Sequence, residues 1–215
     1  MTAAFTGAVL CGGRSRRMGR DKALVVVAGR PLGVRVAEAL ARAGAASVVA
    51  VGGDAPALAR LGLATVPDDR PGLGPLGGIV TALGTASPEP RPGPGPDGPD
   101  GPDAGTVPWA AGDGIVVVAA CDLVAPSPDA LAATVWALAA DDRAAVAVPL
   151  SEGRRHWVHA AWRRSARSAL ATQLDRGERA VHRAVAAAGL TVVELPDLAA
   201  EALADADTPD DLPAP

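Results

Sequence analysis

The 215-residue chain contains no tyrosine, one phenylalanine and four tryptophans, so its hydrophobic core has to be built mainly from aliphatic side chains. Two cysteines, Cys11 and Cys121, are too few for a disulfide framework, and they do not form a Cys-x-x-Cys metal motif. The apolar runs are interrupted by charge or proline well short of a membrane span, and the first residues lack the basic segment of a signal peptide. These absences predict a reduced, cytoplasmic protein without a membrane partner.

Lysine is nearly absent as well, since Lys22 is the single lysine among 20 basic residues. The formal net charge is −4, so no overall excess of positive charge points to nucleic-acid binding. A compact ammonium group is not interchangeable with a planar guanidinium at a phosphate. We therefore expect the one position that keeps a lysine to use it for phosphate binding.

The stretch Val9–Leu24 organises the chain. It follows an apolar run, 3–10, that is typical of a buried strand, and it combines glycines with several charged side chains. The spacing fits neither the Walker loop nor the dinucleotide fingerprint, because Gly19 is followed by Arg-Asp-Lys and the glycine pair lies among arginines. Glycine lets backbone N–H groups approach phosphate oxygens, while basic side chains add positive charge. The stretch therefore predicts a triphosphate cradle formed by Gly12, Gly13, Arg14, Arg17 and Lys22.

Strand-like and helix-like stretches alternate along the chain, which predicts a single α/β domain over 1–215 with right-handed βαβ units and a mostly parallel sheet. Ligands of such sheets gather beyond the carboxyl ends of the strands, where the loop after Leu10 would lie. The helix at 127–140 is expected to be buried around Trp136 because its body is almost wholly apolar. The expected strands are 3–10, 47–51, 64–66, 115–120, 144–148 and 190–195, with a short β-branched run at 24–28, and the expected helices are 31–43, 54–61, 79–86, 127–140, 163–174 and 179–188.

A second informative stretch, Pro67–Gly78, combines two acidic residues with prolines and glycines. Glycines such as Gly74 allow the backbone to press against a flat ligand such as a purine, although the same residues also shape ordinary turns. Asp68 and Asp69 are both candidates for holding the nucleotide, and spacing does not decide between them.

The segment 87–114 breaks the pattern, because proline and glycine dominate it and it offers little to bury. We interpret it as a disordered surface insertion. The run 115–120 that follows is the most hydrophobic of the chain and ends in Cys121-Asp122. A carboxylate at the end of a buried strand, facing a triphosphate loop, is well placed to hold Mg²⁺, so Asp122 is the predicted metal ligand.

These stretches resemble the MobA-like nucleotidyltransferases. The first matches their Leu-x-Gly-Gly-x-Ser-x-Arg-Met-Gly-x-Asp-Lys pattern, with Cys11 where alanine is usual, and the second matches their acidic residue followed by Pro-Gly-x-Gly-Pro-Leu-x-Gly. Cys121-Asp122 begins an element similar to their Cys-Asp-x-Pro, although Val124-Ala125 precede the proline. The ending resembles their Asn-x-Asn-Thr-Pro-x-Asp-Leu, with aspartates at 205 and 207 in place of both asparagines.

The resemblance implies a doubly wound, Rossmann-like three-layer domain of the nucleotide-diphospho-sugar transferase type. It implies transfer of GMP from GTP to Mo-molybdopterin, release of pyrophosphate, Mg²⁺ as cofactor and transient contact with proteins of cofactor biosynthesis or with molybdoenzymes. The segment around His156 and His159 resembles the place where the pterin approaches. The expected catalytic residues are Lys22, Arg17 and Asp122, and the expected nucleotide-binding residues are Leu10, Cys11, Gly12, Gly13, Arg14, Lys22, Gly53, Asp68, Asp69, Gly74 and Asp122.

Two alternatives remain open from the sequence. A related enzyme could use CTP or another phosphorylated acceptor, with base choice set around Leu10, Gly52, Gly53 and the Asp68-Asp69 pair. A protein of a different class could bind the nucleotide without catalysis and assist cofactor assembly. Asp205 or Asp207 could also supply a second carboxylate to the metal, or the ending could simply begin a terminal helix.

Overall fold

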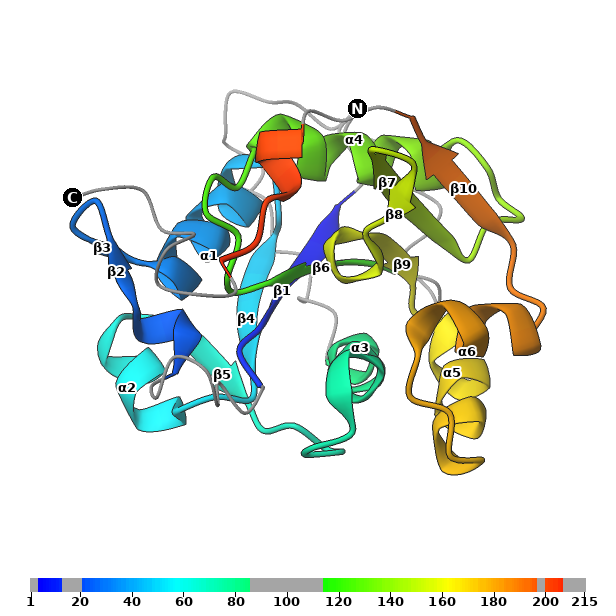
Figure 1. Ribbon diagram of the computed structural model, residues 1–215, viewed down its shortest axis with the longest axis horizontal. Helices are drawn as coiled ribbons and strands as arrows, with labels where there is room; N and C mark the ends of the chain where they lie inside the picture. Colours follow the sequence, from blue (N-terminus) through cyan, green and yellow to red (C-terminus); the bar gives the residue numbers. More distant parts are fainter. Residues whose placement is uncertain (1–3, 13–20, 86–113, 197–199, 207–215) are drawn as a thin grey trace, which may run out of the picture.

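The computed structural model describes residues 4–12, 21–85, 114–196 and 200–206, which form a three-layer α/β domain (Figure 1). Within these residues an eight-stranded sheet runs in the order β10-β7-β9-β6-β1-β4-β5, with β8 paired to β7, while β2 and β3 form a separate ribbon. The strands are β1 (Phe5–Leu10), β2 (Val26–Val27), β3 (Arg30–Pro31), β4 (Ser47–Val51), β5 (Ala64–Val66), β6 (Ile115–Ala120), β7 (Val146–Ser151), β8 (Arg154–Arg155), β9 (Ala161–Arg163) and β10 (Val192–Leu195).

Helices cover both faces of the sheet. Side chains of β1 alternate between them, with Phe5 and Val9 in one hydrophobic core and Ala8 and Leu10 in the other. Because successive strand residues point to opposite faces, each central strand supplies both cores, and the predicted layered fold is confirmed. The helices are α1 (Leu32–Arg42), α2 (Ala55–Arg60), α3 (Gly74–Gly84), α4 (Pro128–Ala139), α5 (Ala166–Asp175) and α6 (Val181–Ala187), with 3₁₀ turns η1 (Lys22–Leu24), η2 (Trp157–His159) and η3 (Ala200–Leu203).

Side-chain caps fix the helix starts that the sequence indicates. The Asp54 carboxylate accepts a hydrogen bond from Ala57 N at 3.0 Å, and the Ser127 hydroxyl accepts one from Ala130 N at 3.2 Å. Gly44 ends α1 with a φ of 100°. These local signals place α1, α2 and α4 where the sequence predicts them.

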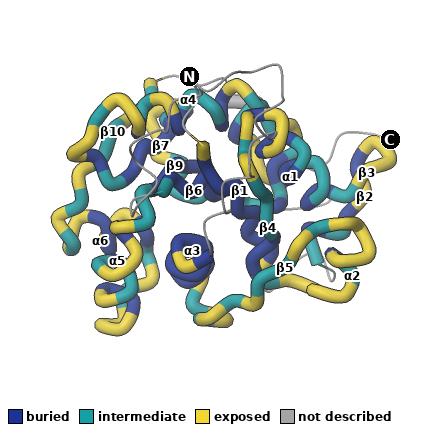
Figure 2. Tube along the Cα trace, turned by 180° about the vertical axis from the view of Figure 1, so that it is seen from behind, coloured by how far each residue is buried: buried dark blue, intermediate teal, exposed yellow. Residues whose placement is uncertain are grey.

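Helix α3 is the most deeply packed helix, and Figure 2 shows it in dark blue below the sheet. Its glycines allow the close approach, since a Cβ atom on Gly78 would lie 3.2 Å from the Leu10 side chain. The helix begins at Gly74, five residues before the expected start at residue 79. Pro75 occupies its first turn, where the missing N–H costs nothing, so the predicted glycine-proline turn is already helical.

The expectation that α4 is buried around Trp136 is wrong. Trp136 is 60% exposed, and the buried side of the helix consists of Ala130, Leu131, Thr134, Val135 and Leu138. The helix packs on the sheet with one face only, so an apolar residue on its outer face remains in solvent. Composition shows that a helix is apolar but does not determine which side is covered.

The expected helix over 163–174 is wrong at its beginning. Arg163 ends strand β9, which lies antiparallel between β6 and β7, and α5 starts only at Ala166. Trp162 in this strand is fully buried and is registered with Val116 and Val146. The strand is three residues long, too short to produce a recognisable alternation of polar and apolar side chains.

The β-branched run 24–28 contains a strand of two residues, β2. Lys22–Leu24 forms the 3₁₀ turn η1, and only Val26 and Val27 pair, with the ribbon partner β3. The segment 87–114, predicted as an insertion, lies outside the described residues except for Gly114. No helix among the described residues is both long and apolar enough to cross a membrane.

Candidate nucleotide-binding site

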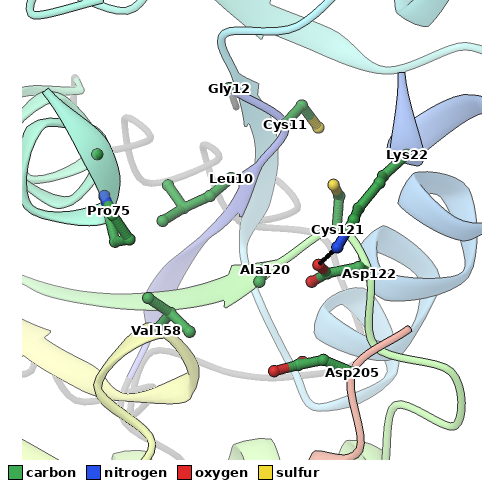
Figure 3. A pocket seen from close by; sticks show the side chains of 11 residues that line it. Leu10, Cys11, Gly12, Lys22, Pro75, Ala120, Cys121, Asp122, Val158 and Asp205 are labelled. Carbon is green, nitrogen blue, oxygen red and sulfur yellow. Dashed lines mark hydrogen bonds and ion pairs between the residues drawn. The ribbon is translucent and has the colours of Figure 1, made fainter. Parts of the chain in front are cut away.

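An open pocket of about 340 Å³ lies beyond the carboxyl ends of β1 and β6 (Figure 3). Parallel neighbouring strands end at the same edge of a sheet, and here the register pairs Leu10 with Ala120. The volume falls in the range of small-molecule sites. The pocket is lined by Leu10, Cys11, Gly12, Lys22, Gly74, Pro75, Ala120, Cys121, Asp122, Val158 and Asp205.

The start of the glycine-rich loop is tied to β4. The backbone N–H groups of Cys11 and Gly12 both donate to the Val51 carbonyl, at 2.9 and 3.1 Å. Gly53, with a φ of 77°, packs so closely under this loop that a Cβ atom on it would lie 2.8 Å from the Cys11 Cβ. The predicted nucleotide-binding residue Gly53 therefore supports the loop from outside the pocket lining.

Lys22 and Asp122 meet inside the pocket. The Lys22 ammonium donates to Asp122 Oδ2 at 2.8 Å, and each side chain is only 17% exposed (Figure 3). Asp21 fixes the turn that carries Lys22, because its two carboxylate oxygens accept from Ala23 N at 3.0 Å and from Asp54 N at 3.1 Å. The only lysine and the predicted metal ligand, 100 residues apart in the chain, thus share one site.

Cys11 and Cys121 lie side by side at the ends of β1 and β6, and both are buried. The hydrogen bond between their side chains, together with burial, raises the pKa of the Cys121 thiol well above its ordinary value. Cys121 is therefore a neutral thiol at neutral pH, and the arrangement disfavours a thiolate nucleophile or metal ligand at this position.

The structure separates the two acidic candidates Asp68 and Asp69. Asp68 Oδ1 accepts from Arg70 N at 2.9 Å and from the Thr81 hydroxyl at 3.0 Å, while a Cβ atom on Gly12 would lie 3.6 Å from Asp68 Oδ2. Asp69 is half exposed, with its carboxylate 3.6 Å from the Arg167 guanidinium on α5. Asp68 thus borders Gly12 at the start of the glycine-rich loop, whereas Asp69 faces Arg167, and neither carboxylate lines the pocket.

Asp205 reaches the pocket from the end of the chain. Backbone hydrogen bonds from Val124 N to Ala204 O (3.0 Å) and from Ala206 N to Asp122 O (2.9 Å) hold it opposite Leu123. Its carboxylate oxygen Oδ1 lies 3.1 Å from His159 Nε2. The sequence indicated Asp205 only as one of two possible second carboxylates for the metal. The replacement of a family asparagine by aspartate at this position is the signal that could have identified it.

His156 and His159, both expected near the pterin, differ in burial. His159 is buried, with 1% of its surface exposed, and is hydrogen-bonded within the protein. His156 stacks against it with ring centroids 6.0 Å apart, and burial followed by the proximity of His159 lowers the His156 pKa. His159 itself does not line the pocket, whereas its neighbour Val158 does.

Several predicted site residues lie outside the described part of the chain, namely Gly13, Arg14, Arg17 and Asp207. Among the described residues, no group of three His, Cys, Asp or Glu side chains could hold a metal ion. Mg²⁺ nevertheless needs only one or two carboxylates when substrate phosphates and water complete its shell. Asp122 and Asp205, which both line the pocket, fit this kind of site.

Comparison with known proteins places the chain among nucleotide-transferring proteins. Residues 7–190 match the family model of the MobA-like NTP transferase domain. A protein from Rhodobacter capsulatus named molybdenum cofactor guanylyltransferase is 35% identical over 216 residues, which cover 97% of this chain and 93% of that protein. A protein of the same name from Xanthomonas euvesicatoria pv. vesicatoria is 48% identical over 83 residues, so this match spans 39% of the chain and only 41% of the relative.

A solved structure supports the fold. The molybdopterin-guanine dinucleotide biosynthesis protein A from Archaeoglobus fulgidus superposes with a TM-score of 0.68 at 22% identity, covering 96% of this chain and 94% of that one. At this level of identity the similarity concerns the architecture alone. It extends over 96% of this chain, and so over the sheet and both helical layers.

Proposed function

Because the chain belongs to the family of MobA-like NTP transferase domains, we propose that it transfers GMP from GTP to Mo-molybdopterin and releases pyrophosphate. The observation that carries the proposal is the Lys22–Asp122 pair at the carboxyl ends of two central parallel strands. A positive side chain for the triphosphate and a carboxylate for a divalent cation are the minimum that such a transfer requires.

In the transfer a phosphate oxygen of the acceptor attacks the α-phosphorus of GTP, and pyrophosphate leaves. Mg²⁺, when bound, neutralises charge on the phosphates and aligns them. Gly12 would offer its backbone to the phosphates, and Asp122, with Asp205, would hold the cation. Lys22 neutralises Asp122 in the free protein at 2.8 Å, and we infer that its ammonium moves to a phosphate oxygen when nucleotide and cation enter.

Asp68 is the proposed reader of the base. Guanine presents two adjacent N–H donors that can both reach one carboxylate oxygen, whereas cytosine offers one amino donor next to acceptors. Thr81 and Arg70 N both donate to Asp68 Oδ1, so Oδ2, the oxygen on the Gly12 side, remains for the base. This arrangement favours GTP over CTP as the donor.

The test is a pyrophosphate-release assay with Mg²⁺ and Mo-molybdopterin, run in parallel with GTP and CTP. We expect release with GTP, little with CTP, and none without the acceptor. Absence of release with either nucleotide would contradict catalysis and support a protein that only binds, whereas equal rates would remove the proposed base preference.

Lys22→Ala is expected to lower kcat by about a hundredfold or more, because a positive group aimed at transition-state charge is worth roughly that factor. Arg60→Ala, which removes one positive charge from an exposed end of α2, should keep normal turnover. Circular dichroism of both variants checks that they fold. Wild-type turnover in the Lys22 variant would exclude this ammonium from the mechanism.

A further inference from the structure

His159 is a buried histidine whose two ring nitrogens have distinct partners. Ala120 N, the last backbone donor of β6, points to His159 Nδ1 at 3.4 Å, so Nδ1 is an acceptor. In a neutral imidazole the hydrogen then sits on Nε2. Nε2 lies 3.1 Å from Asp205 Oδ1, and the N–H therefore donates to that oxygen.

The main chain brings Asp205 close to Asp122, but it does not aim the side chain. Leu123 and Asp205 form an antiparallel bridge flanked by the hydrogen bonds of Val124 with Ala204 and of Ala206 with Asp122. In such a pair, opposite Cα atoms are about 4.5 Å apart. The carboxylate is 38% exposed, and its bond with His159 Nε2 limits its rotation. Asp205 lines the pocket, as Figure 3 shows.

We infer that His159 is a positioning residue that holds the Asp205 carboxylate as a second ligand for the divalent cation whose first ligand is Asp122. The inference rests on the proposed function, since that function supplies the cation. With Oδ1 bound to a rigid, buried imidazole, Asp205 Oδ2 is the oxygen presented to the cation. Hydrogen bonds of this kind orient metal ligands, and their removal commonly costs about 10- to 100-fold in metal affinity.

The experiment measures the Mn²⁺ affinity of the full chain by electron paramagnetic resonance of the free ion, with GTP present and no acceptor, against a parallel titration without protein that gives the Mn²⁺ held by GTP alone. His159→Phe and Asp205→Ala should each weaken Mn²⁺ binding about tenfold, and the double variant should be no weaker than either single variant. His159→Gln, whose amide can donate from nearly the position of Nε2, should keep most of the affinity. His156→Phe, a change in the neighbouring ring that makes no bond to Asp205, should keep wild-type Mn²⁺ affinity.

Unchanged Mn²⁺ affinity in His159→Phe or in Asp205→Ala overturns the inference, as does full additivity of the two. An equal loss in His156→Phe also overturns it, because general packing rather than the hydrogen bond would then be responsible.

Asp122→Asn separates this inference from the proposed function. If only Asp122→Asn loses Mn²⁺ affinity, the proposed cation site is supported and the role of His159 is contradicted. If Asp122→Asn binds Mn²⁺ like wild type, the proposed cation site itself is contradicted. Thermal melts of every variant verify folding. Should His159→Phe fail to fold, Asp205→Ala, at a partly exposed position, tests the inference in its place.

Discussion

Gly53 shows how a residue without a side chain shapes the pocket. Its φ of 77° lies in the left-handed region, and a Cβ atom there would meet the Cys11 Cβ at 2.8 Å and the Leu58 side chain at 3.1 Å. Gly29 has the same φ of 77°, but a Cβ atom on it would have no neighbour within 4 Å. Substitution of Gly29 by alanine would therefore cost only backbone strain, whereas substitution of Gly53 would cost strain and steric crowding.

Gly53→Ala is expected to lower the free energy of unfolding by about 2–4 kcal/mol, the sum of strain and overpacking. Gly29→Ala should cost only the strain, about 1 kcal/mol. Urea unfolding of the two variants measures both values. Equal losses would mean that the Cys11 contact adds nothing and that the close approach of the two loops is relaxed in solution.

At the scale of one element, α6 depends on a carboxylate that precedes it. Ala180, at the N-cap, has no capping side chain, and the Glu178 carboxylate instead fixes the turn before the helix by accepting from Arg179 N at 2.7 Å and from Ala180 N at 2.8 Å. The Arg183 guanidinium also donates to Glu178 at 2.8 Å. The bond from Arg183, followed by the two backbone N–H groups, lowers the Glu178 pKa from 4.5 to about 2.

A lowered pKa in the folded state means that the carboxylate stabilises the protein above pH 4.5 and that this contribution is lost as the pH falls toward about 2. We expect Glu178→Gln, which keeps an acceptor but removes the charge, to have a lower Tm than wild type at pH 6. The difference should narrow steadily between pH 4.5 and pH 3. Since Glu178 and Arg183 are on the surface, added salt should reduce the difference at pH 6. Melting curves across this range provide the test, and a Tm difference independent of pH would contradict it.

At the scale of the whole molecule, Arg164 connects the end of α3 to the residue that precedes β6. Its backbone N–H donates to Gly114 O at 3.0 Å, and its guanidinium donates to the carbonyls of Leu83 and Thr85 at the end of α3. Thr85 and Gly114, the described residues on either side of positions 86–113, are therefore held at one place. This place precedes the amino end of β6, whereas the pocket lies beyond its carboxyl end.

Replacing residues 86–113 with a Gly-Ser linker of about six residues should preserve the fold and raise the free energy of unfolding by about 1 kcal/mol, because a shorter loop loses less entropy on closure. Turnover should remain that of wild type, since neither Thr85 nor Gly114, to which the linker is joined, lines the pocket. Urea unfolding and the pyrophosphate assay measure the two quantities. A folded variant without turnover would show that the segment contributes to the site.

Local patterns in the sequence determined much of this protein. The alternation of apolar runs and capped helices indicated a parallel α/β sheet, and in such a sheet the loop after Leu10 and Asp122 must reach the same edge, so the meeting of Lys22 with Asp122 could be anticipated. The motifs of the first 80 residues also indicated the family, which the comparisons confirm.

Only the tertiary structure decided features that depend on partners distant in the chain. Strand β9 forms because its backbone pairs with β6 on one side and with β7 on the other, and Trp136 is exposed because α4 covers the sheet with its other side. Asp68 rather than Asp69 borders Gly12, and the bond between His159 and Asp205 joins two segments 46 residues apart. Sequence periodicity reports the repeat of a helix or strand along its own axis, whereas these arrangements are set by the surfaces that distant elements present to each other.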